Sequence, residues 1–400
     1  MTMERRETKG MWFVWTAALA LGSAVMGCST EVELNAPYDS IPVVFGLLEL
    51  EADTQWVKIN RTWLGEGDQF EAAAIADSSL YPEGSVEAWM VELIPSSSGV
   101  VTGDELPTGR EWALSETTLD NREPDTVFTW TEHRVFFAET SEEPLEEDKL
   151  YKLELRLPDG KEATATTTLV SGTGSISFPP ASPNYELNLA TVNPVTGLAQ
   201  YSDLILRWNA ANGARLYTLA MIVNYREIVY TDESWTTIES ETDRSLTISL
   251  GSYSVNNVSD GETCNRSFNT ESIYTELASR LEYNPRIRRV FGEYDPLTSK
   301  SRALDFVLQV ANQDLATYMD VNQVSTSIVQ DRPTWSNIQL MDPDGSTRSG
   351  VGLWASRSVM GLYGIAYSKQ SIQHLVEGDL TAGLNFCSPA PSGVSDYSCD

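Results

Sequence analysis

The stretch YKLELRLPDGKEATATTTLV, from Tyr151 to Val170, alternates apolar and polar residues on both sides of a Pro-Asp-Gly turn. Leu153, Leu155 and Leu157 fall on one face, with the period of two that is typical of a half-buried strand. Asp159-Gly160 is a dipeptide suited to a tight hairpin turn. The stretch therefore predicts two antiparallel strands joined by a short turn.

The same alternation recurs from Ile41 to about Val170, in runs rich in Val, Trp, Leu and Thr. Gly, Pro and Asp separate the runs, as expected for strands with hairpin connections. Strands at this spacing predict an immunoglobulin-like or related β-sandwich over residues 41–170. The other runs are IPVVFGLLEL (Ile41–Leu50), TQWVKINRTWL (Thr54–Leu64), SVEAWMVELI (Ser85–Ile94) and TVFTWTEHRVFFAE (Thr126–Glu139).

The composition changes abruptly at residues 171–183, where SGTGSISFPPASP is rich in small residues and proline. Such a segment is typical of an interdomain linker. A second unit is therefore expected over residues 184–400. Its run LILRWNAANGARLYTLAMIVNYREIVY (Leu204–Tyr230) predicts two strands around an Asn-Gly turn, with Trp208 and Tyr217 placed as in a fibronectin type III strand pair.

One segment of the second unit has helical spacing. Apolar residues in Ile273–Leu281 follow Asn269 or Thr270, either of which is a suitable N-cap. Pro285 is expected to end this helix. Strand periodicity returns in Ala303–Gln313, so the chain is predicted to be mainly β, with two immunoglobulin- or fibronectin-like sandwich domains and a helix inserted in the second.

The N-terminus has the layout of an export signal. Arg5, Arg6 and Lys9 precede an almost uncharged run at Met11–Gly27, which is too short for a membrane span with a polar stop. Val25-Met26-Gly27-Cys28 resembles the lipobox of bacterial lipoproteins. We expect residues 1–27 to be a cleaved signal peptide, residues 28–40 to be a tether, and lipid on Cys28 to hold the protein on a membrane. The alternative is an ordinary signal peptide followed by a chance cysteine.

The composition indicates a globular and acidic protein. The chain is 41% hydrophobic and 21% charged, which is ordinary for a domain with a packed core. Its formal net charge of −30 repels phosphate, so a nucleic-acid partner is disfavoured. Plain solubility is the simplest explanation of the excess acid.

Three cysteines remain besides Cys28, in an exported and oxidising setting. Cys387 and Cys399 bracket a short Pro/Ser/Gly segment, so a disulfide between them has the lowest loop-closure cost. A bridge from Cys264 to either one is the alternative, because connectivity cannot be deduced from sequence alone.

Known catalytic motifs are missing from the sequence. It has no HExxH, GxSxG or Walker motif, and its two histidines, His133 and His374, lie far apart along the chain. We therefore assign no catalytic residue, cofactor or metal site. Asp342-Pro343-Asp344-Gly345 is interpreted as a tight turn rather than a calcium loop, and Gly350-Val351-Gly352 as a turn.

Two abundant groups of side chains, the carboxylates and the tryptophans, remain as candidates for a catalytic or sugar-binding site. Carboxylates could supply the acid pair of a glycan hydrolase, although sequence alone cannot pair them. The tryptophans could form a sugar-binding platform, although core positions and cross-strand pairs are the favoured interpretation. Five tryptophans fall in the first unit: Trp56, Trp63, Trp89, Trp112 and Trp130.

Several of these segments together resemble a known family. The chain resembles the uncharacterised Bacteroidota lipoproteins catalogued as domain of unknown function 4249. The similar segments, in chain order, are the lipobox with CSTEVELNAP, IPVVFG, DGKEATATTTLV, RWNAANGARLYTL, VANQDLATYMDVNQ, WSNI and GVGLWAS. The resemblance spans nearly the whole chain after the leader. It implies an outer-membrane lipoprotein, often encoded beside a TonB-dependent receptor, with no established chemistry.

Two functions follow as hypotheses. The first is a lipid-anchored, extracytoplasmic binding or accessory module at the outer membrane, whose partner is a receptor, a glycan or another protein. The second is an exported glycan hydrolase that uses a carboxylate pair.

Overall fold

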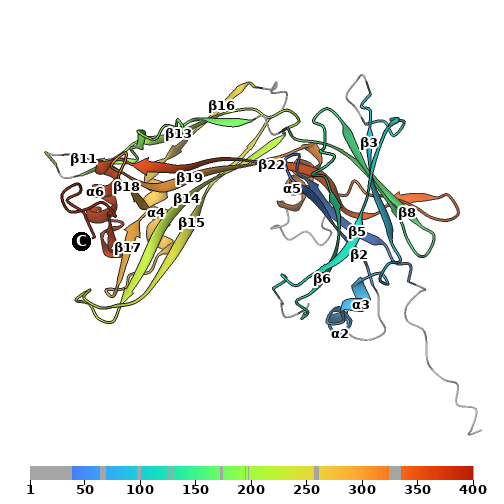
Figure 1. Cartoon of the computed structure of the whole chain (residues 1–400), viewed down its shortest axis with the longest axis horizontal. Helices are drawn as coiled ribbons and strands as arrows, with labels where there is room; N and C mark the ends of the chain where they lie inside the picture. The colour runs from blue at the N-terminus through green and yellow to red at the C-terminus, as the bar shows by residue number, and fades with distance from the viewer. Residues whose placement is uncertain are drawn as a thin grey trace, which may run out of the picture.

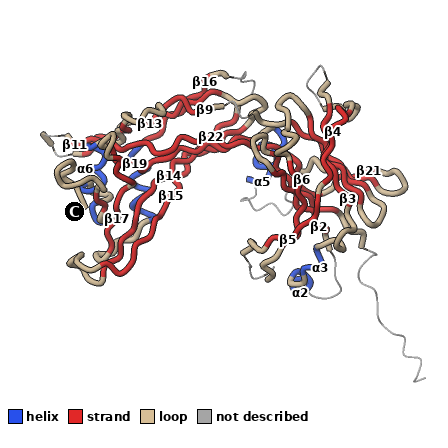
Figure 2. The backbone as a smooth tube through the Cα atoms, in the orientation of Figure 1, coloured by secondary structure: helices blue, strands red, loops and turns tan. Residues whose placement is uncertain are grey.

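The structure is a computed structural model. It describes residues 38–63, 69–96, 101–123, 127, 129–171, 174–193, 195–196, 198–255, 261–323 and 335–399. Figures 1 and 2 show two β-rich units that together form an arch. No helix among the described residues is long and apolar enough to cross a bilayer. Cys28, the expected leader and most of the expected tether lie outside the described residues.

The first unit is a sandwich of two sheets, on the right in Figure 1. Val44, Val57 and Phe136 from one sheet pack against Leu153 and Leu155 from the other, so the predicted alternation does bury one face of each strand. One sheet contains β1 (Pro42–Leu48), β2 (Thr54–Arg61), β6 (His133–Glu139) and β5 (Ser115–Leu119). The other contains β4 (Pro107–Ala113), β3 (Glu87–Leu93), β7 (Leu150–Arg156), β8 (Glu162–Thr168), β20 (Gln339–Met341) and β21 (Thr347–Ser349). Two short helices, α2 (Gln69–Ala73) and α3 (Ala76–Ser79), follow β2.

The second unit packs a large curved sheet against a smaller one. Trp208 and Tyr217 meet between the two layers, with ring centroids 5.3 Å apart, so these strands face each other across the core. The large sheet contains β14 (Leu216–Tyr230), β15 (Ile238–Ser254), β17 (Ile287–Phe291), β18 (Glu293–Asp295), β19 (Lys300–Ala311), β22 (Val351–Tyr367), β10 (Glu186–Leu187) and β23 (Phe386–Cys387). The smaller sheet contains β9 (Ser175–Phe178), β13 (Asp203–Asn209) and β16 (Thr263–Asn269). The remaining elements are β11 (Ala190–Val192), β12 (Ala199–Tyr201), α4 (Thr270–Arg280), α5 (Gln313–Gln323), α6 (Lys369–Glu377) and the 3-10 turn η2 (Ala382–Leu384).

Strand β22 belongs to both units. Its first half pairs in parallel with β1, and its second half pairs antiparallel with β19. One 12-stranded sheet therefore runs through the whole molecule. Trp354 enters the first core, where its indole Nε1 donates to the Tyr151 carbonyl at 2.9 Å, whereas Met360 and Leu362 enter the second.

This sharing corrects the predicted domain boundaries. Residues 184–400 were expected to form the second unit alone, but β20, β21 and the first half of β22 complete the first sandwich. Ile338, Leu340 and Trp354 are buried in its core. Local periodicity could not show this, because it does not reveal which strands pair when they are far apart in the sequence, as Thr164 and Gln339 or Val43 and Val351 are.

In its described part, residues 171 and 174–183, the predicted linker is a structured junction. Ser175–Phe178 forms β9 and pairs with β13. Beside it, the Val170 amide donates to the Ser356 hydroxyl at 2.8 Å, and the Asn312 side chain donates to the Thr168 carbonyl at 2.9 Å. The junction therefore ties the two units together instead of acting as a free spacer.

Helix and turn predictions are met in part. Helix α4 starts at Thr270, and the Asn269 side chain accepts from the Glu271 amide as an N-cap. The helix ends at Arg280, so Pro285 is not what terminates it. Asp342–Gly345 is the tight turn between β20 and β21, as expected.

The turn predicted at Gly350-Val351-Gly352 was wrong, because Val351 and Gly352 lie in β22. Gly352 has a φ of +127°, and a Cβ there would collide with the backbone carbonyl of Val44 on β1. The glycine is thus required by the close approach of two strands.

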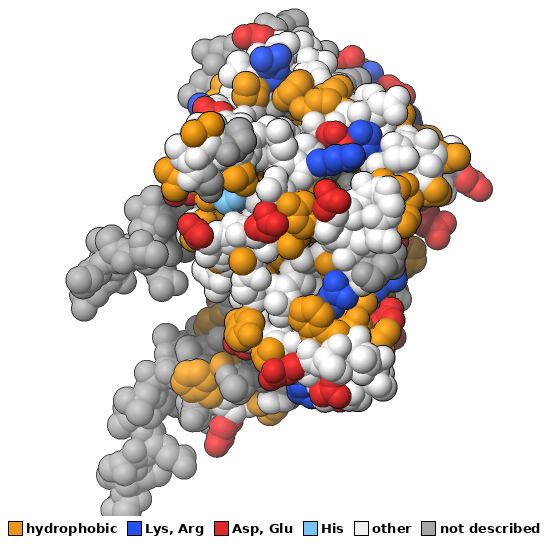
Figure 3. Space-filling view, turned by 90° about the vertical axis from the view of Figure 1, so that its left-hand side faces the viewer, with side chains coloured by type: hydrophobic (Ala, Val, Ile, Leu, Met, Phe, Trp, Pro, Cys, Tyr) orange, Lys and Arg blue, Asp and Glu red, His pale blue; other side chains and the backbone are white. Residues whose placement is uncertain are grey.

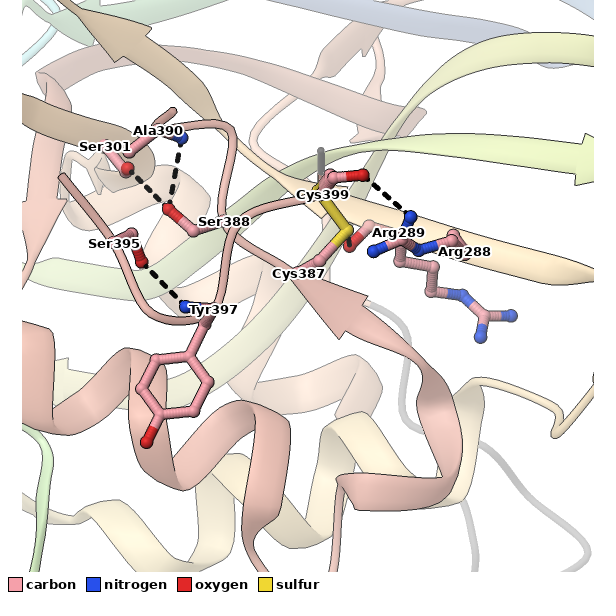
Figure 4. Close-up of a disulfide and its surroundings, with 9 residues drawn as sticks. All are labelled: Arg288, Arg289, Ser301, Cys387, Ser388, Ala390, Ser395, Tyr397 and Cys399. Carbon is pink, nitrogen blue, oxygen red and sulfur yellow. Dashed lines mark hydrogen bonds between the residues drawn. A yellow bond between two sulfur atoms is a disulfide. The ribbon is translucent and has the colours of Figure 1, made fainter. Parts of the chain in front are cut away.

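The C-terminal tail is stapled to the second unit, as Figure 4 shows. Cys387 and Cys399 form a disulfide with an Sγ–Sγ distance of 2.10 Å, which is the local pairing favoured by loop length. Cys264 is a buried free thiol on β16. Arg288 on β17 donates to the Cys399 carbonyl at 2.8 Å, so the end of the chain is held against the sheet.

A candidate binding groove

The two histidines occupy unrelated places. His133 is half-buried on β6 in the first unit, whereas His374 is buried in α6 in the second. Burial, with the nearby Lys58 and Arg122 charges, lowers the pKa of His133. Among the described residues, no three His, Cys, Asp or Glu side chains gather as metal ligands.

The five tryptophans of the first unit have different surroundings. Trp112 is buried in the first core, and Trp89 and Trp130 lie beside the guanidinium groups of Arg156 and Arg122. Trp63 is partly buried. Trp56 forms a cross-strand pair with Phe137, as the favoured interpretation expected, yet 44% of it remains exposed.

Trp56 lines a groove of about 590 Å³ between the first sandwich and helix α5. Phe45 on β1, which is 38% exposed, and Tyr318 on α5 form part of its wall. Their rings meet edge to face, with centroids 6.0 Å apart. Leu315 and Leu353 contribute further apolar surface. A concave, mostly apolar site of this size falls within the usual range for ligand pockets.

A few polar groups stand at fixed positions around the groove. Arg357 on β22 forms an ion pair with Glu49, the residue that follows β1 by one position, and both side chains are partly exposed. Gln55 is buried and braces the β1–β2 turn, because its amide donates to the carbonyls of Glu49 and Ala52 at 2.9 and 3.1 Å. The Glu49 amide donates back to the Gln55 side-chain oxygen at 3.0 Å. These bonds hold Glu49 in place.

The groove opens on the face of the 12-stranded sheet that points away from both cores. Along β22, Trp354 and Met360 at even positions belong to the two cores, whereas Leu353, which is also buried, and Arg357 at odd positions line the groove. Val359 continues this face and is exposed. The sheet therefore presents one surface that extends across both units.

A second concavity of about 640 Å³ lies on the large sheet of the second unit. Two ion pairs line it: Arg226 pairs with Asp243 at 2.9 Å and Arg302 with Asp295 at 3.1 Å. Asp305 beside it accepts from the Asn224 side chain at 2.7 Å. Figure 3 likewise shows acidic and basic side chains interspersed over the end of this unit. The aromatic residues that line this concavity, Tyr225 and Tyr294, are buried and half-buried. The first groove exposes Trp56 and is therefore the better candidate.

The sequence indicates Trp56 as one of several aromatic candidates, but it does not indicate the residues that line the groove with it. Phe45, Tyr318 and Arg357 come from three distant segments, and no spacing in the sequence connects them. Phe45 lies in a predicted strand, where a large apolar residue is ordinarily expected to belong to the core. The groove arises from the pairing of β1 with β22 and the position of α5, which only the structure shows.

Comparison with known proteins adds little. No family model matches the chain, and no curated protein matches it. Among solved structures, the C-terminal globular domain of an oligosaccharyltransferase from Pyrococcus abyssi is similar at 11% identity and a TM-score of 0.18. The match covers 62% of this chain and 43% of that chain, so it spans less than half of the other structure. At this TM-score, it supports no conclusion about this protein.

Proposed function

We propose that this protein is a lipid-anchored, extracytoplasmic binding module that acts at the outer membrane beside a TonB-dependent receptor. The observation that carries the binding role is the groove of Trp56, Phe45 and Tyr318, which exposes aromatic rings on an open sheet face. Exposed aromatic side chains in a concave site commonly mark a binding surface.

The N-terminal segment is held at one end of β1. Asp39 forms ion pairs with Lys161 and Arg348, which fixes the chain just before β1 begins. The groove lies toward the other end of β1, where Glu49 follows the strand, roughly 20 Å away at about 3.3 Å per residue. The first described residues therefore lie at the end of β1 opposite Glu49.

The lining of the groove favours binding over hydrolysis. Among the described residues that line it, Glu49 is the single carboxylate, and it is paired with Arg357. A glycosidase ordinarily needs two carboxyl groups across the scissile bond. We therefore prefer the binding role to the carboxylate-based hydrolase.

Photo-crosslinking in native membranes tests the proposal. A benzophenone amino acid at position 56 or 318 should capture a partner in the envelope, whereas the same group in place of Trp89, on the opposite sheet, should not. Equal capture at all three positions, or none at positions 56 and 318, would contradict a binding role for the groove. A Cys28→Ser variant tests the anchor separately, because it should move the protein to the soluble fraction.

A further inference from the structure

We propose that the groove binds an uncharged oligosaccharide. This inference rests on the proposed binding function and names its ligand class. It rests on two features of the groove, a fixed aromatic ring and an ion pair held at the rim, and on the charge of the whole protein.

The aromatic ring is exposed and held in place. Phe137 packs against the Trp56 ring with centroids 5.4 Å apart and planes tilted by 38°. Beside it, Phe45 on the same face of the neighbouring strand β1 packs edge to face against Tyr318 on α5. The C–H face of a sugar ring is flat and apolar, so it can cover an indole without displacing these neighbours.

The rim supplies hydrogen-bonding groups suited to hydroxyls. The Glu49 carboxylate accepts hydrogen bonds and the Arg357 guanidinium donates them, so together they can bind neighbouring hydroxyl groups of one sugar. Gln55 holds the turn that carries Glu49, which reduces the ordering cost of binding. A purely apolar peptide would instead cover this ion pair without replacing its bonds to water, which is unfavourable.

Charge selects among glycans. The Glu49–Arg357 pair is neutral as a unit, and the protein carries a formal net charge of −30. Long-range repulsion therefore disfavours a polyanionic chain at this surface. An uncharged oligosaccharide meets neither a repulsive field nor an unmatched local charge.

Calorimetric titration of the full mature chain, purified in detergent, tests the ligand class. The neutral probes are the hexasaccharides of cellulose, laminarin, starch and xylan, and the anionic probe is hexagalacturonate. We expect at least one neutral probe to bind and hexagalacturonate to bind more weakly. Trp56→Ala should lower the affinity by at least about tenfold, as expected for a central aromatic contact.

Two further variants sharpen the result. Trp89→Ala removes an indole from the other sheet of the same unit and should leave the affinity unchanged. Glu49→Gln keeps the size of the side chain but removes the carboxylate, so it should weaken binding. This variant tests the groove independently of Trp56→Ala, whose folding the lost indole could impair. Binding that Trp56→Ala and Glu49→Gln both leave intact, tighter binding of hexagalacturonate, or no binding of any neutral probe would overturn the proposal.

The two proposals can fail separately. If position 56 captures an envelope partner but no neutral glycan binds, the ligand class is wrong while the binding role stands. If position 56 captures nothing and no glycan binds, both are wrong.

Discussion

Asn337 shows how one side chain can position a strand. Its amide donates to the Trp354 carbonyl at 2.6 Å and accepts from the Trp354 amide at 2.9 Å, so it pairs with β22 as a backbone segment would. Trp354 is fully buried in the first core. Asn337 of the segment WSNI thus bonds the backbone of GVGLWAS. The sequence alone does not show this contact, because it does not say which segments pair.

Replacing Asn337 should therefore weaken the first unit. Asn337→Ala leaves two backbone groups of Trp354 without partners, which should lower the free energy of unfolding by roughly 2–4 kcal/mol. Chemical denaturation measures the loss. Asn209→Ala, at a half-buried position on β13 away from this contact, is the matched control, and an equal loss in the two variants would show that Asn337 has no special role.

His374 is the most deeply buried titratable imidazole among the described residues, with 2% of its surface exposed. It packs edge to face on Tyr274 and lies 3.2 Å from the Tyr201 hydroxyl. Burial lowers its pKa below the ordinary value, and the Asp379 charge opposes this only in part. The native state therefore favours the neutral ring more than the unfolded chain does.

This burial predicts a loss of stability in mild acid. The unfolded chain takes up a proton on His374 below about pH 6.5, whereas the native state resists it, so unfolding becomes easier as the pH falls through that value. The melting temperature should be lower at about pH 5.5 than at about pH 7.5. His374→Gln should reduce this difference. Burial also lowers the pKa of His133, so the His133→Gln variant measures how much of the pH dependence comes from that residue. A difference in melting temperature between the two pH values that is unchanged in His374→Gln would contradict the assignment to His374.

At the scale of elements, hairpins could be predicted and long-range pairings could not. Strands β7 and β8 were predictable because Leu153, Leu155 and Asp159-Gly160 encode alternation and turn within a few residues. The parallel pairing of β1 with β22 joins Val43 to Val351, and nothing local specifies that partner. The binding groove depends on this same pairing, so only Trp56 could be nominated from sequence.

The C-terminal tail is closed by one covalent bond in addition to its hydrogen bonds. Cys387 and Cys399 are 12 residues apart, and closing a loop of this length stabilises the folded state by about 3 kcal/mol in the chain-entropy model. The Cys387→Ser/Cys399→Ser double variant should lose about that much and expose its tail to proteolysis. Cys264→Ser tests whether the effect is specific to the bridge, and a double variant as stable and protease-resistant as the parent would refute it.

At the scale of the molecule, the shared sheet makes the two units depend on each other. Strand β22 contributes Trp354 to one core and Met360 and Leu362 to the other. The units were expected to be separate domains joined by a linker, but the structured junction and the 12-stranded sheet make them one body.

Thermal unfolding should therefore be cooperative across the whole chain. Scanning calorimetry should show one transition with equal calorimetric and van't Hoff enthalpies. Asn337→Ala should shift the whole transition, although the substitution lies in the first unit. Two resolved transitions, with only one of them shifted in the variant, would show that the units unfold independently.

In the function proposed above, the open face of the shared sheet binds its partner in the groove of Trp56. Hydrogen–deuterium exchange of the full chain, with and without solubilised envelope, tests this most directly. We expect added protection in residues 47–56 and in α5, and we expect Trp56→Ala but not Trp89→Ala to abolish it. Protection confined to other surfaces, or protection that survives Trp56→Ala, would contradict it.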